Sequence, residues 1–358
     1  MVMNPANPAG PSVTVLMTMF NAAAHLRAAV ASILGQTFGD FEFVIVDDGS
    51  TDASAAIVES FGDARIRLVR NERNNGQTPC LNQGLVLARG TWVARQDADD
   101  ISLPRRLERQ VAFLRAHPGV ALLGTAARQI DGEGRALGVQ TPPADPWAIR
   151  WMNLFDNSFF HSAVMIRTAV VREELGGYDE SFRCSQDYAL WSRLARRHAV
   201  ANFAEPLIAL RVHAASMMRS QTSLLEDETG RILRANCAAE FPGRTFTGEE
   251  HALLAAYRWQ IAPERLAPFH ALLAELRAAF LAAHPEARDA VDAALGRQSA
   301  RIAYNLLPQH RTAALREYAH GLRAWPGIFA AQPWARILAL LVLGDSARAL
   351  YRRLSPAK

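Results

Sequence analysis

Short apolar segments alternate with amphipathic segments over the first 120 residues of the chain. The apolar segments are nearly continuous, which is typical of strands buried on both faces of a parallel sheet. They predict strands at 13–19, 41–46, 66–69 and 92–96. The segments between them have helical periodicity and predict helices at 22–34, 53–61 and 77–88, the last one closed by Gly90 as a capping glycine.

This alternation suits right-handed crossovers and predicts an α/β fold with an open, mostly parallel, doubly wound sheet. Ligands of such sheets bind beyond the carboxyl ends of the strands. Two acidic clusters, 47–52 and 97–100, directly follow the second and fourth predicted strands. We therefore expect both clusters at one ligand-binding edge of the sheet.

The pattern changes twice further along the chain. Strand-like pieces at 121–123, 163–166 and 201–203 mix with helical pieces at 146–153 and 187–197. After residue 221 the chain is almost entirely helical and rich in alanine, with breaks at prolines. The organisation expected from these changes is a loose leader at 1–11, a first half of the sheet domain at 12–117, a second half at 118–220 and a helical region at 221–358.

The composition narrows the class of protein. Hydrophobic residues make up 50% of the chain and charged residues 21%, which indicates a globular protein and excludes a disordered one. Lysine and arginine number 39 and aspartate and glutamate 35, a net charge of +4 that is too small to indicate a nucleic-acid-binding protein. The first residues have neither a basic nor an apolar signal-peptide region, so we expect a cytoplasmic protein.

The acidic clusters carry the candidate chemistry. Asp97 and Asp99 project the same way from a strand end, and two close carboxylates repel each other unless a divalent cation lies between them. Mg²⁺ or Mn²⁺ fits such a site and leaves positions for phosphate oxygens. The alternative is a surface loop that caps the helix near Pro104. Asp47 and Asp48 offer acceptors for a base or a ribose hydroxyl, with helix capping again the alternative.

Two common nucleotide motifs are missing from the sequence. It has neither G-x-G-x-x-G nor G-x-x-x-x-G-K-[ST], so neither a dinucleotide fingerprint nor a P-loop explains the sheet. A metal-bridged nucleotide diphosphate is the remaining natural ligand.

Residues 12–215 contain a series of motifs in a fixed order: VTVLMTMFN, SILGQTFGDFEFVIVDDGSTD, the Asn75-Gly76 and Leu81-Asn82-Gln83-Gly84 run, DADD, FHSAVMIR, GGYDESF and QDYALWSRL. In these motifs and their order the chain resembles the inverting family 2 glycosyltransferases of the GT-A fold. The resemblance implies that 12–117 binds a nucleotide sugar and that 118–220 binds the acceptor. It also implies transfer of a single sugar from a nucleotide diphosphate sugar, with UDP as the expected nucleotide, to a glycan or a lipid-linked acceptor, as in bacterial polysaccharide and lipopolysaccharide biosynthesis.

The resemblance also implies residue roles. Asp47 would contact the uracil with Asp48 as its neighbour, and Asp97 and Asp99 would form the Asp-x-Asp pair that holds the metal. Asp187 would be the catalytic base, although the family usually has Glu at Gln186. The residues expected to line the donor pocket in addition are Thr18, Phe20, Asn21, Arg73 and Gly76. His213, in an Arg-x-His sequence, would complete the metal shell or contact the diphosphate, with simple packing as the alternative.

Two alternative functions remain open, and the C-terminal tail has two interpretations. A nucleotidyltransferase also uses a doubly wound sheet and a metal-bound nucleotide, and a catalytically inactive scaffold would keep the same fold. In the tail, 334–354 combines Trp, Leu and Arg in an amphipathic pattern. That pattern indicates either a peripheral contact with the inner face of the cytoplasmic membrane or a helix docked on the core.

Overall fold

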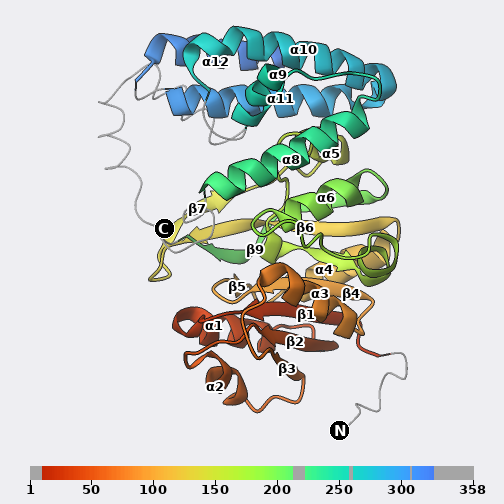
Figure 1. Ribbon diagram of the computed structural model, residues 1–358, viewed down its shortest axis with the longest axis vertical. Helices are drawn as coiled ribbons and strands as arrows, with labels where there is room; N and C mark the ends of the chain where they lie inside the picture. Colours follow the sequence, from red (N-terminus) through yellow and green to blue (C-terminus); the bar gives the residue numbers. More distant parts are fainter. Residues whose placement is uncertain (1–9, 213–221, 258–260, 307–308, 326–358) are drawn as a thin grey trace. The chain divides into compact units, whose positions relative to one another are not determined.

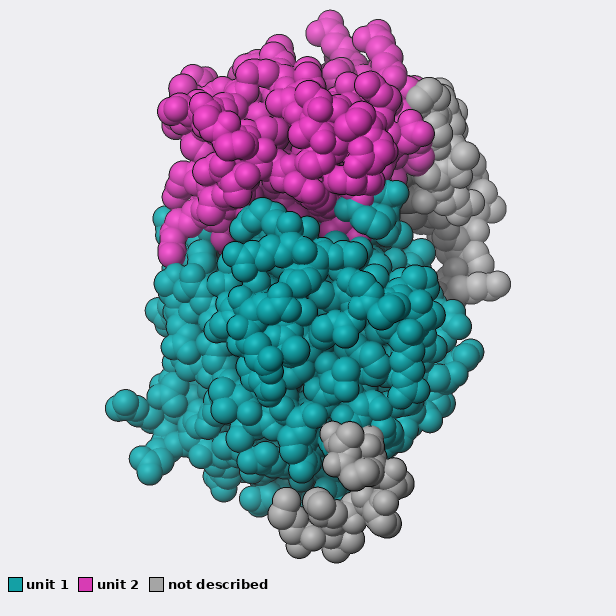
Figure 2. Space-filling view, turned by 90° about the vertical axis from the view of Figure 1, so that its right-hand side faces the viewer, with its two compact units in different colours: residues 1–146, 157–228 teal, residues 147–156, 229–358 magenta. Residues whose placement is uncertain are grey.

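A computed structural model of the chain describes residues 10–212, 222–257, 261–306 and 309–325 (Figure 1). The chain divides into two compact units, 1–146 with 157–228 and 147–156 with 229–358 (Figure 2). His213, most of the leader and the amphipathic segment 334–354 lie outside the described residues.

The first unit is built on one mixed sheet. Its strands are β1 (Val13–Met19), β2 (Phe41–Asp47), β3 (Ile66–Arg70), β4 (Trp92–Asp97), β5 (Ile101–Ser102), β6 (Val120–Ile130), β7 (Ala136–Gln140), β8 (Met165–Arg167) and β9 (Ala199–Arg211). Their spatial order is β3-β2-β1-β4-β8-β6-β9-β5, with β7 paired to β6. The strands from β1 to β4 are parallel, whereas β8 lies antiparallel between β4 and β6.

Helices cover both faces of the parallel part of this sheet. They are α1 (Ala23–Leu34), α2 (Ser54–Glu59), α3 (Gln77–Leu87) and α4 (Arg106–Ala116), and a further helix of this unit, α6 (Gln186–Ala195), follows β8 in the chain. Alternate β1 side chains such as Val15 and Met17 pack in one core cluster with α1 and α4. Leu16 points to the other face, where Gly84 of α3 leaves room for it. Every residue of β1 and β2 is therefore buried, which explains their nearly continuous apolar sequences.

The second unit is helical. It contains α5 (Pro146–Met152) and α9 (Gly248–Ala256), followed by α10 (Leu266–Ala283), α11 (Arg288–Leu306) and α12 (Arg311–Ala324). The helix α8 (Thr222–Glu240) begins in the first unit and ends in the second. Trp151 and Phe155, at and after the end of α5, share one core cluster with Phe280 of α10.

One described helical segment, Pro263–Ala283, is long and apolar enough to cross a membrane. Core helices of soluble domains meet the same criteria, and six apolar side chains of α10 are buried in the core of the second unit.

Two details of the sequence interpretation were wrong. The helix α3 ends with Ala88 as its C-cap, so Gly90 does not cap it. A Cβ atom at Gly90 would instead lie 2.3 Å from the backbone nitrogen of Thr14 in β1, which makes close backbone approach the reason for this glycine. The strands β6 and β9 are also far longer than the pieces predicted at 121–123 and 201–203. The local pattern does not reveal their full length because their pairing shifts register around Ala126 and Pro206.

Candidate functional site

The register of the sheet brings two predicted site aspartates to the end of β1. Thr18 pairs with Asp97 of β4, and Met19 pairs with Asp47 of β2. Both carboxylates therefore flank the last residues of one strand, at the carboxyl edge where a doubly wound sheet binds its ligands.

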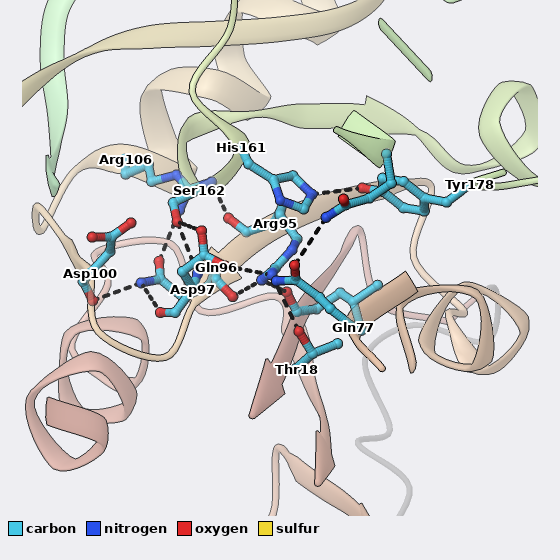
Figure 3. A network of polar contacts seen from close by, with 12 residues as sticks. Thr18, Gln77, Arg95, Gln96, Asp97, Asp100, Arg106, His161, Ser162 and Tyr178 are labelled. Atoms are coloured by element: carbon cyan, nitrogen blue, oxygen red, sulfur yellow. Dashed lines mark hydrogen bonds and ion pairs between the residues drawn. The ribbon is translucent and has the colours of Figure 1, made fainter. Parts of the chain in front are cut away.

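A buried arginine connects two of these positions (Figure 3). Arg95 of β4 is completely buried and donates through Nη2 to Asp97 Oδ1 at 2.6 Å and to Thr18 Oγ1 at 3.3 Å. Ser162 donates from Oγ to Asp97 Oδ2 at 2.5 Å and accepts the Asp97 N–H at 3.0 Å. Burial works to raise the pKa of Asp97, but Arg95 and Ser162 more than offset it and leave the pKa lowered. Asp97 is therefore held ionised in a fixed orientation.

The neighbouring carboxylates are organised by Arg211 at the end of β9. Its backbone N–H donates to Asp100 Oδ1 at 2.8 Å, and its Nε donates to the carbonyl oxygen of Asp99 at 2.9 Å. Asp100 is buried, and burial, together with the charges of Asp97 and Asp99, raises its pKa well above the usual value. Asp99 is only half-buried.

This donor set fits a divalent cation. A divalent cation prefers hard oxygen ligands such as the carboxylates of Asp97 and Asp99, and it would offset the negative charge of these two groups, which adds to burial in raising the pKa of Asp100. Within the ranges that the structure describes, no group of three or more His, Cys, Asp and Glu side chains could hold a metal ion by itself. The third predicted ligand, His213, is outside those ranges.

Asp48 holds the loop that leads into α3. Its carboxylate accepts the backbone N–H groups of Asn75 and Gly76, both at 2.8 Å, and the Asn71 side chain at 3.2 Å. Gly76 has a φ of 97° and precedes the first residue of α3. These contacts give Asp48 and Gly76 a structural role in the loop before α3, whereas the Arg73 side chain is exposed.

The loops after β1 and β2 are tied together by Asn21. Its backbone has a φ of 47°, and its Oδ1 accepts the N–H of Thr51 at 2.9 Å. Asp47 is buried and accepts the N–H of Ser50 at 3.0 Å. Phe20 lies between these fixed points with 47% of its surface exposed, so its ring is available to a ligand.

The structure connects Asp187 to the same region through paired amides. Gln186 and Asp187 begin α6, and the Gln186 Nε2 donates to Gln77 Oε1 at 3.0 Å. Gln77 is the first residue of α3 and follows Gly76. Asn157 donates from Nδ2 to Asp187 Oδ2 at 2.9 Å and fixes the rotation of the half-buried carboxylate.

His161 is excluded as a proton-transfer group at neutral pH. Its Nε2 lies 3.0 Å from the hydroxyl of Tyr178, and its ring packs against Trp191. Burial, with the charge of Arg95, lowers its pKa to about 3, so the imidazole stays neutral. His161 supports the site by packing and by this hydrogen bond.

The sequence analysis missed Arg95, Ser162 and Asn157. For Arg95 a signal was available, because a charged residue in an otherwise apolar buried strand requires a partner such as the acid two residues later. For Ser162 and Asn157 no local pattern existed, since each meets its aspartate from a distant part of the chain.

Comparisons with known proteins agree on one family. Residues 14–169 match the profile of the family described as glycosyl transferase family 2. The chain is 32% identical over 210 residues to the amylovoran biosynthesis glycosyltransferase AmsE of Erwinia amylovora, covering 57% of this chain and 77% of that protein. It is 35% identical over 189 residues to the putative glycosyltransferase EpsE of Bacillus subtilis, covering 51% of this chain and 66% of that protein.

The matches leave part of each chain uncovered. An uncharacterized glycosyltransferase of Haemophilus influenzae is 30% identical over 213 residues, and this chain again spans 66% of its length, just under two thirds. Among solved structures, S. aureus TarS 1–349 in complex with UDP-GlcNAc has a TM-score of 0.55 and 17% identity, covering 88% of this chain and 91% of that one. This likeness shows the fold, and it confirms the predicted doubly wound domain with a helical C-terminal region.

Proposed function

Because the chain belongs to glycosyl transferase family 2, we propose that it transfers a single sugar from a nucleotide diphosphate sugar to an acceptor hydroxyl with inversion. The observation that carries the proposal is the pairing of Thr18 with Asp97 beside Asp47, with Asp187 joined to this edge through the Gln77–Gln186 hydrogen bond. An inverting transfer requires a site for the pyrophosphate and the nucleobase of the donor. It also requires a separate carboxylate that accepts the proton of the acceptor hydroxyl.

We propose UDP as the nucleotide of the donor. The exposed Phe20 ring and the buried Asp47 carboxylate provide stacking and an acceptor for the base. Asp97 has both oxygens engaged by Arg95 and Ser162, which favours a role toward the ribose or a metal-bound water. Asp99 is then the direct ligand of Mn²⁺ or Mg²⁺, with His213 as the proposed further ligand. A bound cation would supply charge compensation for the departing diphosphate.

Asp187 is proposed as the general base. Its carboxylate takes the proton of the acceptor hydroxyl while that oxygen forms a bond to the anomeric carbon. The bond from the anomeric carbon to the diphosphate breaks, and its electron pair stays on the diphosphate oxygen. Attack from the face opposite the leaving group inverts the anomeric centre, and Asn157 keeps the carboxylate aimed at that face.

We propose a glycan or a lipid-linked intermediate as the acceptor. The name of the relative AmsE, an amylovoran biosynthesis glycosyltransferase, supports polysaccharide synthesis as the setting. The amphipathic segment 334–354 would then hold the protein at the cytoplasmic face of the membrane. Partition of the full chain and of a chain truncated after Pro333 into anionic liposomes tests this contact, and equal partition would contradict it.

The test of the proposed function combines binding with turnover. We expect UDP to bind in calorimetry only with Mn²⁺ or Mg²⁺, and a panel of nucleotide sugars with glycan or lipid-linked acceptors to release UDP. Asp99→Asn should lose the metal-dependent part of UDP binding, because a carboxylate ligand becomes a neutral amide. Asp187→Asn should keep UDP affinity and lose about 10²–10⁴-fold in kcat, the usual contribution of a general base.

The control is Glu173→Gln, an exposed carboxylate whose replacement should change neither quantity. Full turnover by Asp187→Asn would contradict the mechanism. Release of pyrophosphate from a nucleoside triphosphate and a sugar phosphate would establish a nucleotidyltransferase instead. If the protein binds no nucleoside diphosphate, the remaining interpretation is a catalytically inactive scaffold.

A further inference from the structure

One buried carboxylate binds three consecutive backbone amides immediately before α6. Glu228 of α8 accepts the N–H of Arg183 at 2.6 Å on Oε1, and the N–H groups of Cys184 at 2.9 Å and Ser185 at 2.8 Å on Oε2. Only 1% of Glu228 is exposed. Burying a carboxylate is costly unless hydrogen bonds satisfy it, and three amide donors at these distances do so.

These amides form the entrance to the helix that carries Asp187. Ser185 is the N-cap of α6, and its side chain makes no capping hydrogen bond. Glu228, from a helix more than forty residues later, therefore binds the N-cap amide and the two amides before it, rather than the first helical amides that a local cap binds, and its negative charge lies near the positive end of the α6 dipole. The start of α6 is consequently fixed by α8, which lies beyond the region 14–169 that matches the family.

We propose that Glu228 is a positioning residue for the catalytic base, an inference that rests on the proposed function. Asp187 follows the last amide bound by Glu228 by two residues, so the carboxylate of Glu228 sets where the first turn of α6 begins. Small displacements of a catalytic group are expensive, since a misplacement of about 1 Å lowers rates by about 100-fold. The donor half of the site is held by other contacts, those of Asp48, Arg95 and Ser162.

The experiment compares Glu228→Gln with Asp227→Asn in the full chain. The glutamine keeps the shape but turns an amide toward backbone donors, whereas Asp227 is the adjacent, exposed carboxylate on the same helix. We expect Glu228→Gln to lower kcat by about 10- to 100-fold while the KM for the donor and the affinity for UDP with Mn²⁺ stay within about twofold. Glu228→Asp, which keeps the charge on a shorter side chain, should recover part of kcat, and Asp227→Asn should match the wild type.

A second measurement needs no turnover. Hydrogen–deuterium exchange of the wild type should show slow amides at 183–185, and they should become fast in Glu228→Gln, or in Glu228→Asp where the glutamine variant does not fold. Fast exchange of these amides in the wild type overturns the inference. Wild-type kcat in Glu228→Gln, or an equal loss of kcat and donor affinity, also overturns it. Absence of sugar transfer by the wild type contradicts the proposed function instead, and the exchange data then decide whether Glu228 holds the amides.

Discussion

Asp97 and Asp100 are three residues apart and lie in opposite electrostatic environments. Arg95 and Ser162 lower the pKa of Asp97 against the effect of its burial. Asp100 is buried beside the negative charges of Asp97 and Asp99, which raise its pKa, and its hydrogen bond from the Arg211 N–H does not offset them. The ionised form of Asp100, next to the proposed metal ligands, is therefore energetically unfavourable.

This contrast predicts the pH dependence of an Asp100→Asn variant. A group whose pKa is raised by folding stabilises the protein at pH values below its unfolded pKa, and the contribution is lost as the pH rises through the folded pKa. The asparagine does not titrate and keeps an oxygen for the Arg211 N–H. In the presence of a chelator, Asp100→Asn should therefore gain stability over the wild type as the pH rises above about 4, the ordinary pKa of an aspartate.

Thermal unfolding at several pH values measures this difference. Asp97 has a lowered pKa and loses its contribution as the pH falls, but it does so in both proteins and largely cancels. Glu173→Gln, an exposed replacement, should show no such pH-dependent gain. A stability difference between Asp100→Asn and the wild type that does not change with pH would show that folding does not raise the pKa of Asp100.

At the scale of single residues, the sequence identified those candidate site residues that belong to a recognisable motif. Asp47 and Asp97 follow predicted strands, so their location at one sheet edge could be inferred, whereas Asp187 was identified only through the family resemblance. The partners that fix them could not be inferred, because Ser162 and Asn157 reach them through tertiary contacts. The roles of the candidate site residues remain predictions.

At the scale of elements, close packing of the loop before β4 against β1 fixes the edge that carries the site. Gly90 lies against the backbone of Val13 and Thr14, and the Thr14 hydroxyl accepts its N–H at 2.9 Å. The glycine therefore lets the chain entering β4 approach the start of β1 closely, in the same strand pair whose register places Thr18 opposite Asp97.

Gly90→Ala should destabilise the protein. The added Cβ atom would lie 2.3 Å from the Thr14 nitrogen and 2.5 Å from the Val13 carbonyl carbon, and backbone atoms cannot move aside as a side chain can. Overpacking of this kind costs about 1–3 kcal/mol, which urea unfolding resolves. Gly39→Ala is the matched control because nothing lies within 4 Å of its added Cβ atom. Equal stability of the two variants would contradict the packing argument.

The strands β1 to β4 and the helices α1 to α3 were predicted within about two residues, because nearly continuous apolar strands alternating with amphipathic helices have distinctive sequences, whereas β5 and α4 were not predicted. The long strands β6 and β9 were not, since they contain residues that are uncommon in strands. Gly124 sits against Asn202, and Glu205 and Pro206 interrupt β9 where its pairing shifts. Irregular pairing of this kind is decided by the partner strand and is invisible to local periodicity.

At the scale of the whole molecule, the chain has two compact units, each with its own core. The helix α5 was predicted correctly as a helix. Its residues pack with the C-terminal helices of the second unit, although the chain segments before and after it belong to the first unit. Amphipathic periodicity identifies a buried face without identifying what covers it. The proposed donor site, by contrast, lies entirely within the first unit.

Ligand binding should therefore stabilise one unit selectively. A ligand present at 100 times its Kd adds about 2.7 kcal/mol to the stability of the state that binds it. UDP with Mn²⁺ should slow hydrogen exchange in β1, β2 and β4, while peptides from α10 and α11 keep their rates because their core is separate. In Asp99→Asn the slowing should disappear, since the metal-dependent part of binding is lost. Equal slowing of α10 and α11 would instead mean that the two cores unfold as one cooperative structure, and it would contradict this division.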